Sequence, residues 1–218
     1  DDNMLKAEEN SKDYKWAYFA ALPVYYFVVE VPLHESVHGL AAAISPNYEV
    51  VEFTPYPHFA SEQDSFVFGS VIMECGGKAH CPYDAGLGAI FLAPYIMNSA
   101  LFVTSDTLLA TEVVDSASVS GRALYFAGMA APWLDFTYNT IWTGRASDSA
   151  AIADSFGIRR SSVVATGAVI SAVGAWRLWS GYKRAFPNHR HEKAKESNVL
   201  VTPMGGAETV GLSLRGSF

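Results

Sequence analysis

Residues 16–33, WAYFAALPVYYFVVEVPL, run without a break into residues 34–44, HESVHGLAAAI, and this stretch decides the fold. Glu30 is the one charged residue of its first part. An apolar run of about 20 residues is long enough to cross the hydrocarbon core of a bilayer as a helix. The stretch therefore predicts an apolar helix that carries a group of ionisable residues near its end.

Three later stretches, residues 85–103, 123–142 and 161–176, are also apolar and nearly free of charge. Each approaches the length of a membrane span, and their frequent small residues suit closely packed helices. They predict a mainly α-helical, multi-pass membrane protein with about four apolar transmembrane helices. The alternative is a soluble bundle, because small residues also suit the middle of such a bundle.

The composition excludes several classes of protein. The 218 residues are 50% hydrophobic and 17% charged, whereas an ordinary soluble domain has about 25% charged residues. A disordered chain is excluded, because such chains are poor in apolar residues. The net charge of −7 argues against nucleic acid as a partner, which would require a basic surface. Two cysteines are too few for a disulfide-rich scaffold.

Residues 48–75 differ in pattern from the apolar stretches around them. Residues 48–54 alternate polar and apolar side chains, and residues 66–73 are rich in β-branched and aromatic types. The pattern predicts a β-hairpin or small sheet inserted after the helix that carries HESVH.

The two ends of the chain are more polar than its centre. Residues 1–15 form a polar, acidic N-terminal segment. Residues 183–218 begin with a basic stretch and end with alternating apolar and small or polar residues over 210–215. This pattern predicts a basic linker followed by a C-terminal strand.

The motif HExxH, formed by His34, Glu35 and His38, has the clearest chemical meaning. Residues i and i+4 lie on one face of a helix, so both imidazoles can bind the same zinc ion. The glutamate between them can accept a proton from metal-activated water. Two core or interfacial histidines on a helix would give the same pattern. Because three ionisable groups in an apolar helix are costly without a purpose, we expect a zinc site with Glu35 as the catalytic residue.

Catalytic zinc needs a third protein ligand and keeps its fourth position open. We expect this ligand to be Asp135, the one carboxylate within the later apolar stretches, because a buried carboxylate requires a counter-charge. The alternative for Asp135 is a place after Pro132 where a backbone N–H satisfies it. The other candidate ligands are Glu112, His58 and His80.

Several motifs together resemble the site-2 protease family of intramembrane zinc proteases. They are HExxH in an apolar helix, a β segment after it, Ala93-Pro94 followed by Asn98, and Leu134-Asp135. The resemblance covers about residues 16–142, and Phe136 stands where the family has glycine.

The resemblance implies that residues 16–182 form a helical, metalloprotease-like domain. In that family the two histidines and the aspartate bind zinc, which corresponds here to His34, His38 and Asp135. The resemblance also implies that Asn98 binds the substrate. The alternative for Asn98 is a hydrogen bond to a neighbouring helix.

The expected function is that of a zinc-dependent membrane endopeptidase, with Glu35 as the general base for metal-activated water. Its expected partners are the lipid bilayer and a polypeptide substrate, with membrane proteins among the candidate substrates. One alternative is a catalytically silent membrane relative that acts as a binding protein. The other is a soluble, exported zincin.

Charge and cysteine positions predict an orientation in the membrane. Lysine and arginine are frequent before the first apolar stretch and after the last, whereas residues 45–84 contain one, Lys78. The positive-inside rule then places both termini in the cytoplasm and the β segment outside. Cys75 and Cys81 are spaced closely enough to close a small disulfide loop, which the outer side would permit. Two free thiols are the alternative.

Overall fold

The computed structural model describes residues 16–60, 65–76, 81–141, 147–187, 200–206 and 209–215. The chain divides into two compact units, Asp1–Ala185 and Phe186–Phe218. Residues 1–15 and most of the basic linker therefore lie outside the described residues. The predicted C-terminal strand is one arm of a hairpin in the second unit, in which β5 (Leu200–Gly206) pairs with β6 (Thr209–Arg215) in antiparallel fashion.

The first helix is continuous from Trp16 to Ala43 but changes its winding part-way. Residues 16–25 are α-helical, η1 (Tyr26–Glu30) is a π-helical segment, and α2 (Val31–Ala43) is α-helical again. Pro32 lies in the first turn of α2. A π-helical segment is rare and often marks a functional region. Here η1 directly precedes α2, the helix that carries HExxH.

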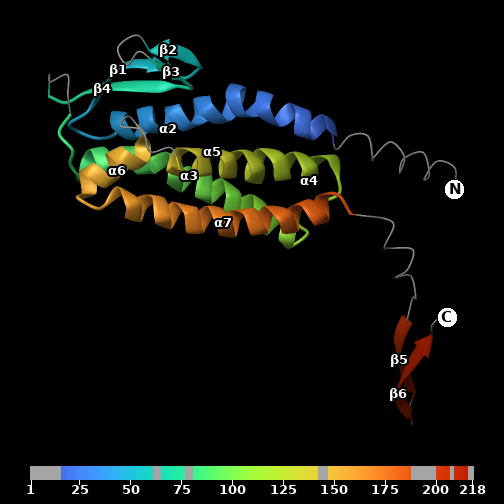
Figure 1. Cartoon of the computed structure of the whole chain (residues 1–218). Coiled ribbons are helices and arrows are strands. Elements are labelled where there is room, and N and C mark those ends of the chain that lie inside the picture. The colour runs from blue at the N-terminus through green and yellow to red at the C-terminus, as the bar shows by residue number, and fades with distance from the viewer. Residues whose placement is uncertain are drawn as a thin grey trace. The chain divides into compact units, whose positions relative to one another are not determined.

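The remaining helices follow the β segment. They are α3 (Ala85–Ala110), α4 (Val119–Leu124), η2 (Tyr125–Ala130), α5 (Ala131–Ile141), α6 (Asp148–Phe156) and α7 (Arg160–Ala185). Figure 1 shows the first helix, α3, the α4–α5 run and α7 side by side along one axis, with the short α6 at one end. Asp84 caps α3 and Ser147 caps α6, since each side chain accepts a backbone N–H of the first turn.

Within the described residues, three helices are long and apolar enough to cross a membrane: Trp16–Ala43, Ala85–Ala110 and Arg160–Ala185. The prediction of a mainly helical protein is confirmed, and three of the four apolar stretches become such helices. The fourth apolar stretch, residues 123–142, forms η2 and α5, and it is not one of the three helices that are long and apolar enough to cross a membrane. Its second half carries Asp135, Asn139 and Thr140, and these polar residues reduce its hydropathy.

Two small antiparallel sheets follow α2, which confirms the predicted β insertion. β1 (Glu49–Thr54) pairs with β4 (Ser70–Glu74), and β2 (His58–Ala60) pairs with β3 (Ser65–Val67). Phe68, in the turn between β3 and β4, packs against Phe27 at 5.3 Å and Tyr138 at 5.5 Å between ring centroids. This aromatic contact fixes the β3–β4 turn to the first helix and to α5.

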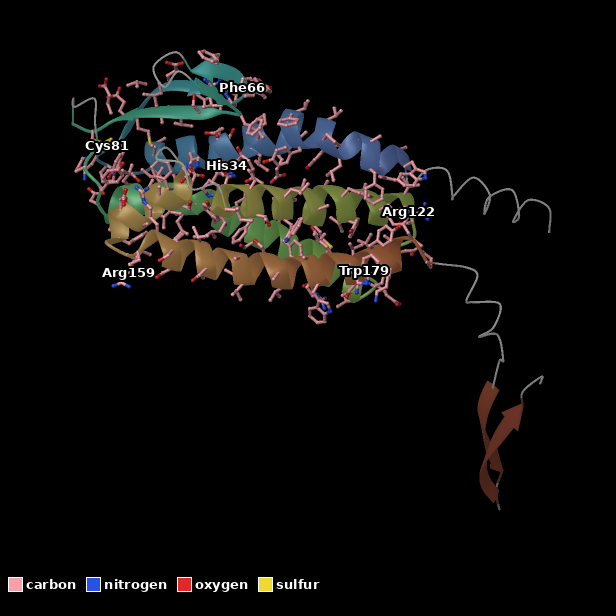
Figure 2. The ribbon with its side chains drawn as sticks, viewed as in Figure 1. His34, Phe66, Cys81, Arg122, Arg159 and Trp179 are labelled. Atoms are coloured by element: carbon pink, nitrogen blue, oxygen red, sulfur yellow. A yellow bond between two sulfur atoms is a disulfide. The ribbon has the colours of Figure 1, made fainter. Side chains whose placement is uncertain are left out.

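Cys75 and Cys81 form a disulfide. The bond joins the end of β4 to the segment that leads into α3, so it ties the β1–β4 sheet to the helical bundle. The sequence left open whether these two cysteines form a disulfide or remain free thiols, and the structure has the disulfide. Figure 2 shows Cys81 at one end of the bundle, with Arg122 and Trp179 toward the other.

Candidate metal centre

His34 and His38 lie one turn apart on α2, and both are buried. Their Nε2 atoms are 3.1 Å apart, and the ring centroids are 4.8 Å apart. The i, i+4 spacing therefore brings both imidazoles to one point, as the motif predicted. Figure 2 shows that His34 lies nearer to the Cys81 end of the bundle than to the opposite end.

Asp148, the first residue of α6, completes a close group with the two histidines. Its Oδ2 lies 3.0 Å from His34 Nε2 and 3.3 Å from His38 Nε2. With bonds of about 2.0 Å, two ligands of a tetrahedral zinc ion lie about 3.3 Å apart. The three atoms thus form a triangle of nearly the size that one zinc ion requires, and these residues could hold a metal ion.

The other ring nitrogens show which nitrogen of each histidine is free to bind. His34 Nδ1 lies 2.6 Å from Asp135 Oδ2, and His38 Nδ1 lies 3.0 Å from the carbonyl oxygen of Ile90. Both partners are acceptors, so each Nδ1 donates a proton to its partner, and each Nε2 is the nitrogen that faces Asp148. Metal-binding histidines are held in this way by an acceptor on the second nitrogen.

A metal ion bound at this point would contact both Nε2 atoms and balance the charge of the Asp148 carboxylate. Two imidazole nitrogens and one carboxylate oxygen are ligands typical of zinc, so the donor set fits this ion. Alternatively, a proton on Nε2 of either histidine, donated to the Asp148 carboxylate, would balance the charge of that carboxylate. Measurement of bound metal distinguishes the two.

The Asp148 carboxylate is suited to bind a cation. Burial alone would raise its pKa, but the neighbouring His38 and His34 hold the pKa of Asp148 below its usual range. Its position at the start of a helix, where backbone N–H groups are unpaired, also favours a negative charge. Asp148 is therefore ionised at neutral pH.

Asp135 lies on the opposite side of His34 from Asp148. Its Oδ2 accepts the Nδ1 proton of His34, and Asn98 Nδ2 donates to the same oxygen at 2.7 Å. Its Oδ1 accepts hydrogen bonds from Tyr26 Oη at 3.1 Å and Asn139 Nδ2 at 3.2 Å. Four donors therefore fix this buried carboxylate as the support of His34.

This arrangement bears on the predicted third ligand. The sequence predicted that Asp135 would join His34 and His38 at the metal. The structure brings Asp135 to His34, but through Nδ1, while the group of converging ligand atoms contains Asp148. In the structure Asp135 therefore contacts the ring nitrogen of His34 that faces away from Asp148.

Asn98 lies at the same place behind His34. It is 1% exposed, and its Nδ2 donates to Asp135 across the interface between α3 and α5. This hydrogen bond is the helix-to-helix contact that the sequence left as the alternative to substrate binding. Asn98 Oδ1 has no hydrogen-bond partner among the described residues.

Glu35 lies beside His34 on α2, under the turn between β3 and β4. A Cβ atom added to Gly69 would lie 2.5 Å from Glu35 Cγ. Any side chain at position 69 would therefore displace Glu35. Because Gly69 has no side chain, Glu35, the expected general base, can occupy this position.

The other candidate ligands are not part of this group. His58 contacts the carbonyl oxygen of Tyr56 at 2.9 Å and Ser70 Oγ at 3.3 Å. Glu112 is exposed in the turn after α3, with a φ of 58°. His80 lies outside the described residues.

Sequence reasoning did not find Asp148, although one signal was present. Ser147-Asp148 has the composition of a helix start, with a capping residue followed by an acidic first turn. That signal predicts where α6 begins. It does not predict that α6 packs against α3 so that Asp148 reaches α2.

The comparisons with known proteins give no family for this chain. No protein-family model matches it, and neither a curated protein nor a solved structure matches it.

Proposed function

We propose that this protein is a zinc-dependent membrane endopeptidase. The observation that carries the proposal is the triangle of His34 Nε2, His38 Nε2 and Asp148 Oδ2, with sides of 3.0, 3.1 and 3.3 Å, beside Glu35. His34, His38 and Asp148 would hold the ion. The open fourth position would suit catalysis, because structural zinc sites have four protein ligands.

Glu35 would act as the general base and then as the general acid. A bound zinc ion would supply Lewis acidity for attack on a peptide carbonyl. Glu35 takes a proton from the attacking water, whose oxygen bonds to the carbonyl carbon. When the C–N bond breaks, Glu35 returns the proton to the departing amine. The products are a carboxylic acid and an amine, so atoms and protons balance.

Asp135 and the Ile90 carbonyl would act as positioning groups for this reaction. Each accepts the Nδ1 proton of one histidine and turns the Nε2 atom of that ring toward Asp148. Because Asp135 is itself held by donors from three other helical residues, the ring of His34 has little freedom to rotate. A fixed ring keeps the ligand atoms in place before the ion binds.

The position of the site suits a substrate that approaches from one side of a membrane. His38 is followed by five residues to the end of α2 at Ala43, or about 8 Å along the helix axis. Ile90 lies near the start of α3, and Asp148 precedes α7. The group therefore lies near the ends of all three long apolar helices, under the β segment.

Metal analysis of the detergent-purified protein, combined with a peptide-cleavage assay, tests this proposal. Wild type should bind one zinc ion per chain, and His34→Ala, His38→Ala and Asp148→Ala should each lose it. Glu35→Gln should keep zinc and lose cleavage. His58→Ala is the matched control and should keep both.

Three outcomes would count against the proposal. Full zinc content in Asp148→Ala would remove the proposed third ligand. Zinc without any cleavage would favour the silent binding protein. A monodisperse protein in buffer without detergent would favour the soluble zincin.

A further inference from the structure

One face of α7 changes character toward the C-terminal end of the helix. Its residues Val169, Trp176, Trp179 and Lys183 follow one another at spacings of seven, three and four positions, so they lie on the same side of the helix. Val169 is 66% exposed, Trp176 63% and Trp179 59%, and Lys183 is exposed as well. The face therefore passes from apolar to aromatic to basic. We propose that its basic end binds the headgroups of anionic phospholipids.

The length of α7 places this end at the level of the headgroups. Its 26 residues extend about 39 Å, whereas the hydrocarbon core of a bilayer is about 30 Å thick. With the membrane embedding proposed above, the ends of α7 therefore reach beyond the core. Tryptophan is enriched at the boundary of the core, and lysine near a helix end extends toward the headgroups. Trp176 and Trp179 thus mark the boundary, and Lys183 lies on its polar side.

The first helix contributes aromatic residues at the same end of the bundle. Tyr182 stacks on Trp179 with 5.8 Å between ring centroids, and Phe19 lies 6.2 Å from Tyr182. Trp16 lies 6.2 Å from Phe19 and is exposed. Aromatic side chains of two long apolar helices are therefore gathered at one level. This arrangement is typical of the boundary between the hydrocarbon core and the headgroups.

The charge of this end of α7 favours an anionic headgroup. α7 contains four basic residues and no acidic one. Asp106 on α3 accepts hydrogen bonds from Arg177 at 2.7 Å and from Arg184 at 3.2 Å, so one carboxylate serves two arginines. Lys183 has no ion-pair partner among the described residues. The excess positive charge is complementary to lipid phosphate.

Basic residues continue on either side of this end of α7. Arg122 on α4 donates from Nε to the carbonyl oxygen of Ala185 at 3.1 Å, and Figure 2 shows Arg122 toward the same end of the bundle as Trp179. In the sequence, the ten residues after Ala185 include three more basic residues and one acidic residue. Clusters of about four to eight basic residues beside the cytoplasmic end of a membrane helix are typical of anionic-lipid binding. The orientation that the positive-inside rule predicts places this end at the cytoplasmic leaflet, whose surface is negative.

Quenching of tryptophan fluorescence by brominated lipid tests the proposal on the full chain. The protein is reconstituted in vesicles of phosphatidylcholine and phosphatidylglycerol in equal parts, with bromine on one lipid or on the other. The difference between wild type and Trp176→Phe/Trp179→Phe gives the signal of these two tryptophans. Brominated phosphatidylglycerol should quench this signal more strongly than brominated phosphatidylcholine. The preference should shrink between about 0.1 M and about 1 M salt, because the screening length falls from about 10 Å to about 3 Å.

Lys183→Glu and Arg159→Glu are the matched variants. Both reverse one exposed charge, the first near the end of α7 and the second immediately before its start. A basic residue near an anionic surface contributes about fivefold to affinity, so Lys183→Glu should lower the preference for phosphatidylglycerol by about fivefold or more. Arg159→Glu should leave the preference unchanged.

Three results would overturn the proposal: equal quenching by the two lipids, a preference that salt does not change, or an equal loss of preference in both charge variants. None of these results would bear on the proposed peptidase activity, because the measurement requires neither zinc nor cleavage. Quenching of the two tryptophans by neither lipid would overturn the proposal together with the membrane embedding on which it rests.

Discussion

His34 Nδ1 lies 2.6 Å from Asp135 Oδ2, and this contact turns the other nitrogen of His34 toward Asp148. One imidazole thus connects two carboxylates that lie on different helices. Asp148 is on the side where an ion would bind, and Asp135 is on the side where the ring is held. The two aspartates should therefore respond differently to substitution.

Asp135→Asn should weaken zinc binding without abolishing it. The amide has nearly the same shape, but it is uncharged, and its NH2 group would face donors where the carboxylate has an acceptor. Changes behind a metal-binding histidine typically cost about 10- to 100-fold in metal affinity. Competition with a chelator of known affinity measures the change.

Asp148→Asn and Asp154→Asn are the comparison variants. Asp148→Asn should bind zinc much more weakly than Asp135→Asn, while Asp154→Asn, at an exposed ion pair with Arg160, should match wild type. If Asp135→Asn were the weakest binder and Asp148→Asn bound normally, Asp135 would be the third ligand after all.

Gly69→Ala should reduce turnover while zinc stays bound. The new Cβ would lie 2.5 Å from Glu35 Cγ, so either the glutamate or the β3–β4 turn must move. Displacement of a catalytic group by about 1 Å can cost about 100-fold in rate. The value of kcat, measured together with zinc content, tests this expectation.

Gly39→Ala is the matched control for this change. A Cβ at position 39 would meet Phe53 at 4.0 Å, an ordinary contact distance. The helix should gain up to about 1 kcal/mol from alanine, with unchanged kcat. Equal activity in the two alanine variants would show that the β3–β4 turn does not position Glu35.

Glu30→Met should stabilise the protein. Glu30 is 0% exposed, and neither carboxylate oxygen has a hydrogen-bond partner among the described residues. Methionine has a similar shape and no unsatisfied polar atom, so the change should add about 1–3 kcal/mol to the free energy of unfolding. Thermal unfolding in detergent measures it, with the exposed neighbour change Leu33→Met as the control. A lower unfolding temperature for Glu30→Met than for Leu33→Met would mean that Glu30 has a stabilising partner.

Reduction of the Cys75–Cys81 bond should destabilise the first unit. The two cysteines are six residues apart, and closure of so short a loop contributes about 2–3 kcal/mol in the chain-entropy model. Dithiothreitol should therefore lower the unfolding temperature of wild type. The Cys75→Ser/Cys81→Ser double variant should unfold at the lower temperature with or without the reagent. A wild type insensitive to reduction would contradict the expected contribution.

The sequence predicted the parts of the site that depend on local spacing. Two histidines four residues apart share a helix face wherever that helix packs, so the pairing of His34 with His38 needed no tertiary information. The apolar runs likewise predicted the long helices. Asp148 is different, because 114 residues separate it from His34 and only the packing of α6 brings them together.

Asp135 shows a second kind of limit. Its burial was predictable from its apolar surroundings, and burial of a carboxylate does require partners. Burial alone, however, does not predict which residues or ions are the partners of Asp135. Tyr26, Asn98 and Asn139 come from three helical segments, and together with His34 they satisfy the carboxylate without a metal ion.

The disulfide has a consequence for the supply of the metal. Such bonds persist in oxidising compartments, and Cys81 leads into α3, whose Ile90 carbonyl orients His38. We therefore expect the centre to be loaded after the segment has crossed the membrane, from the zinc pool outside the cytoplasm. In intact cells, a membrane-impermeant chelator should strip the metal, and external zinc should restore it. Protection of the metal until the membrane is permeabilised would place the site on the cytoplasmic side.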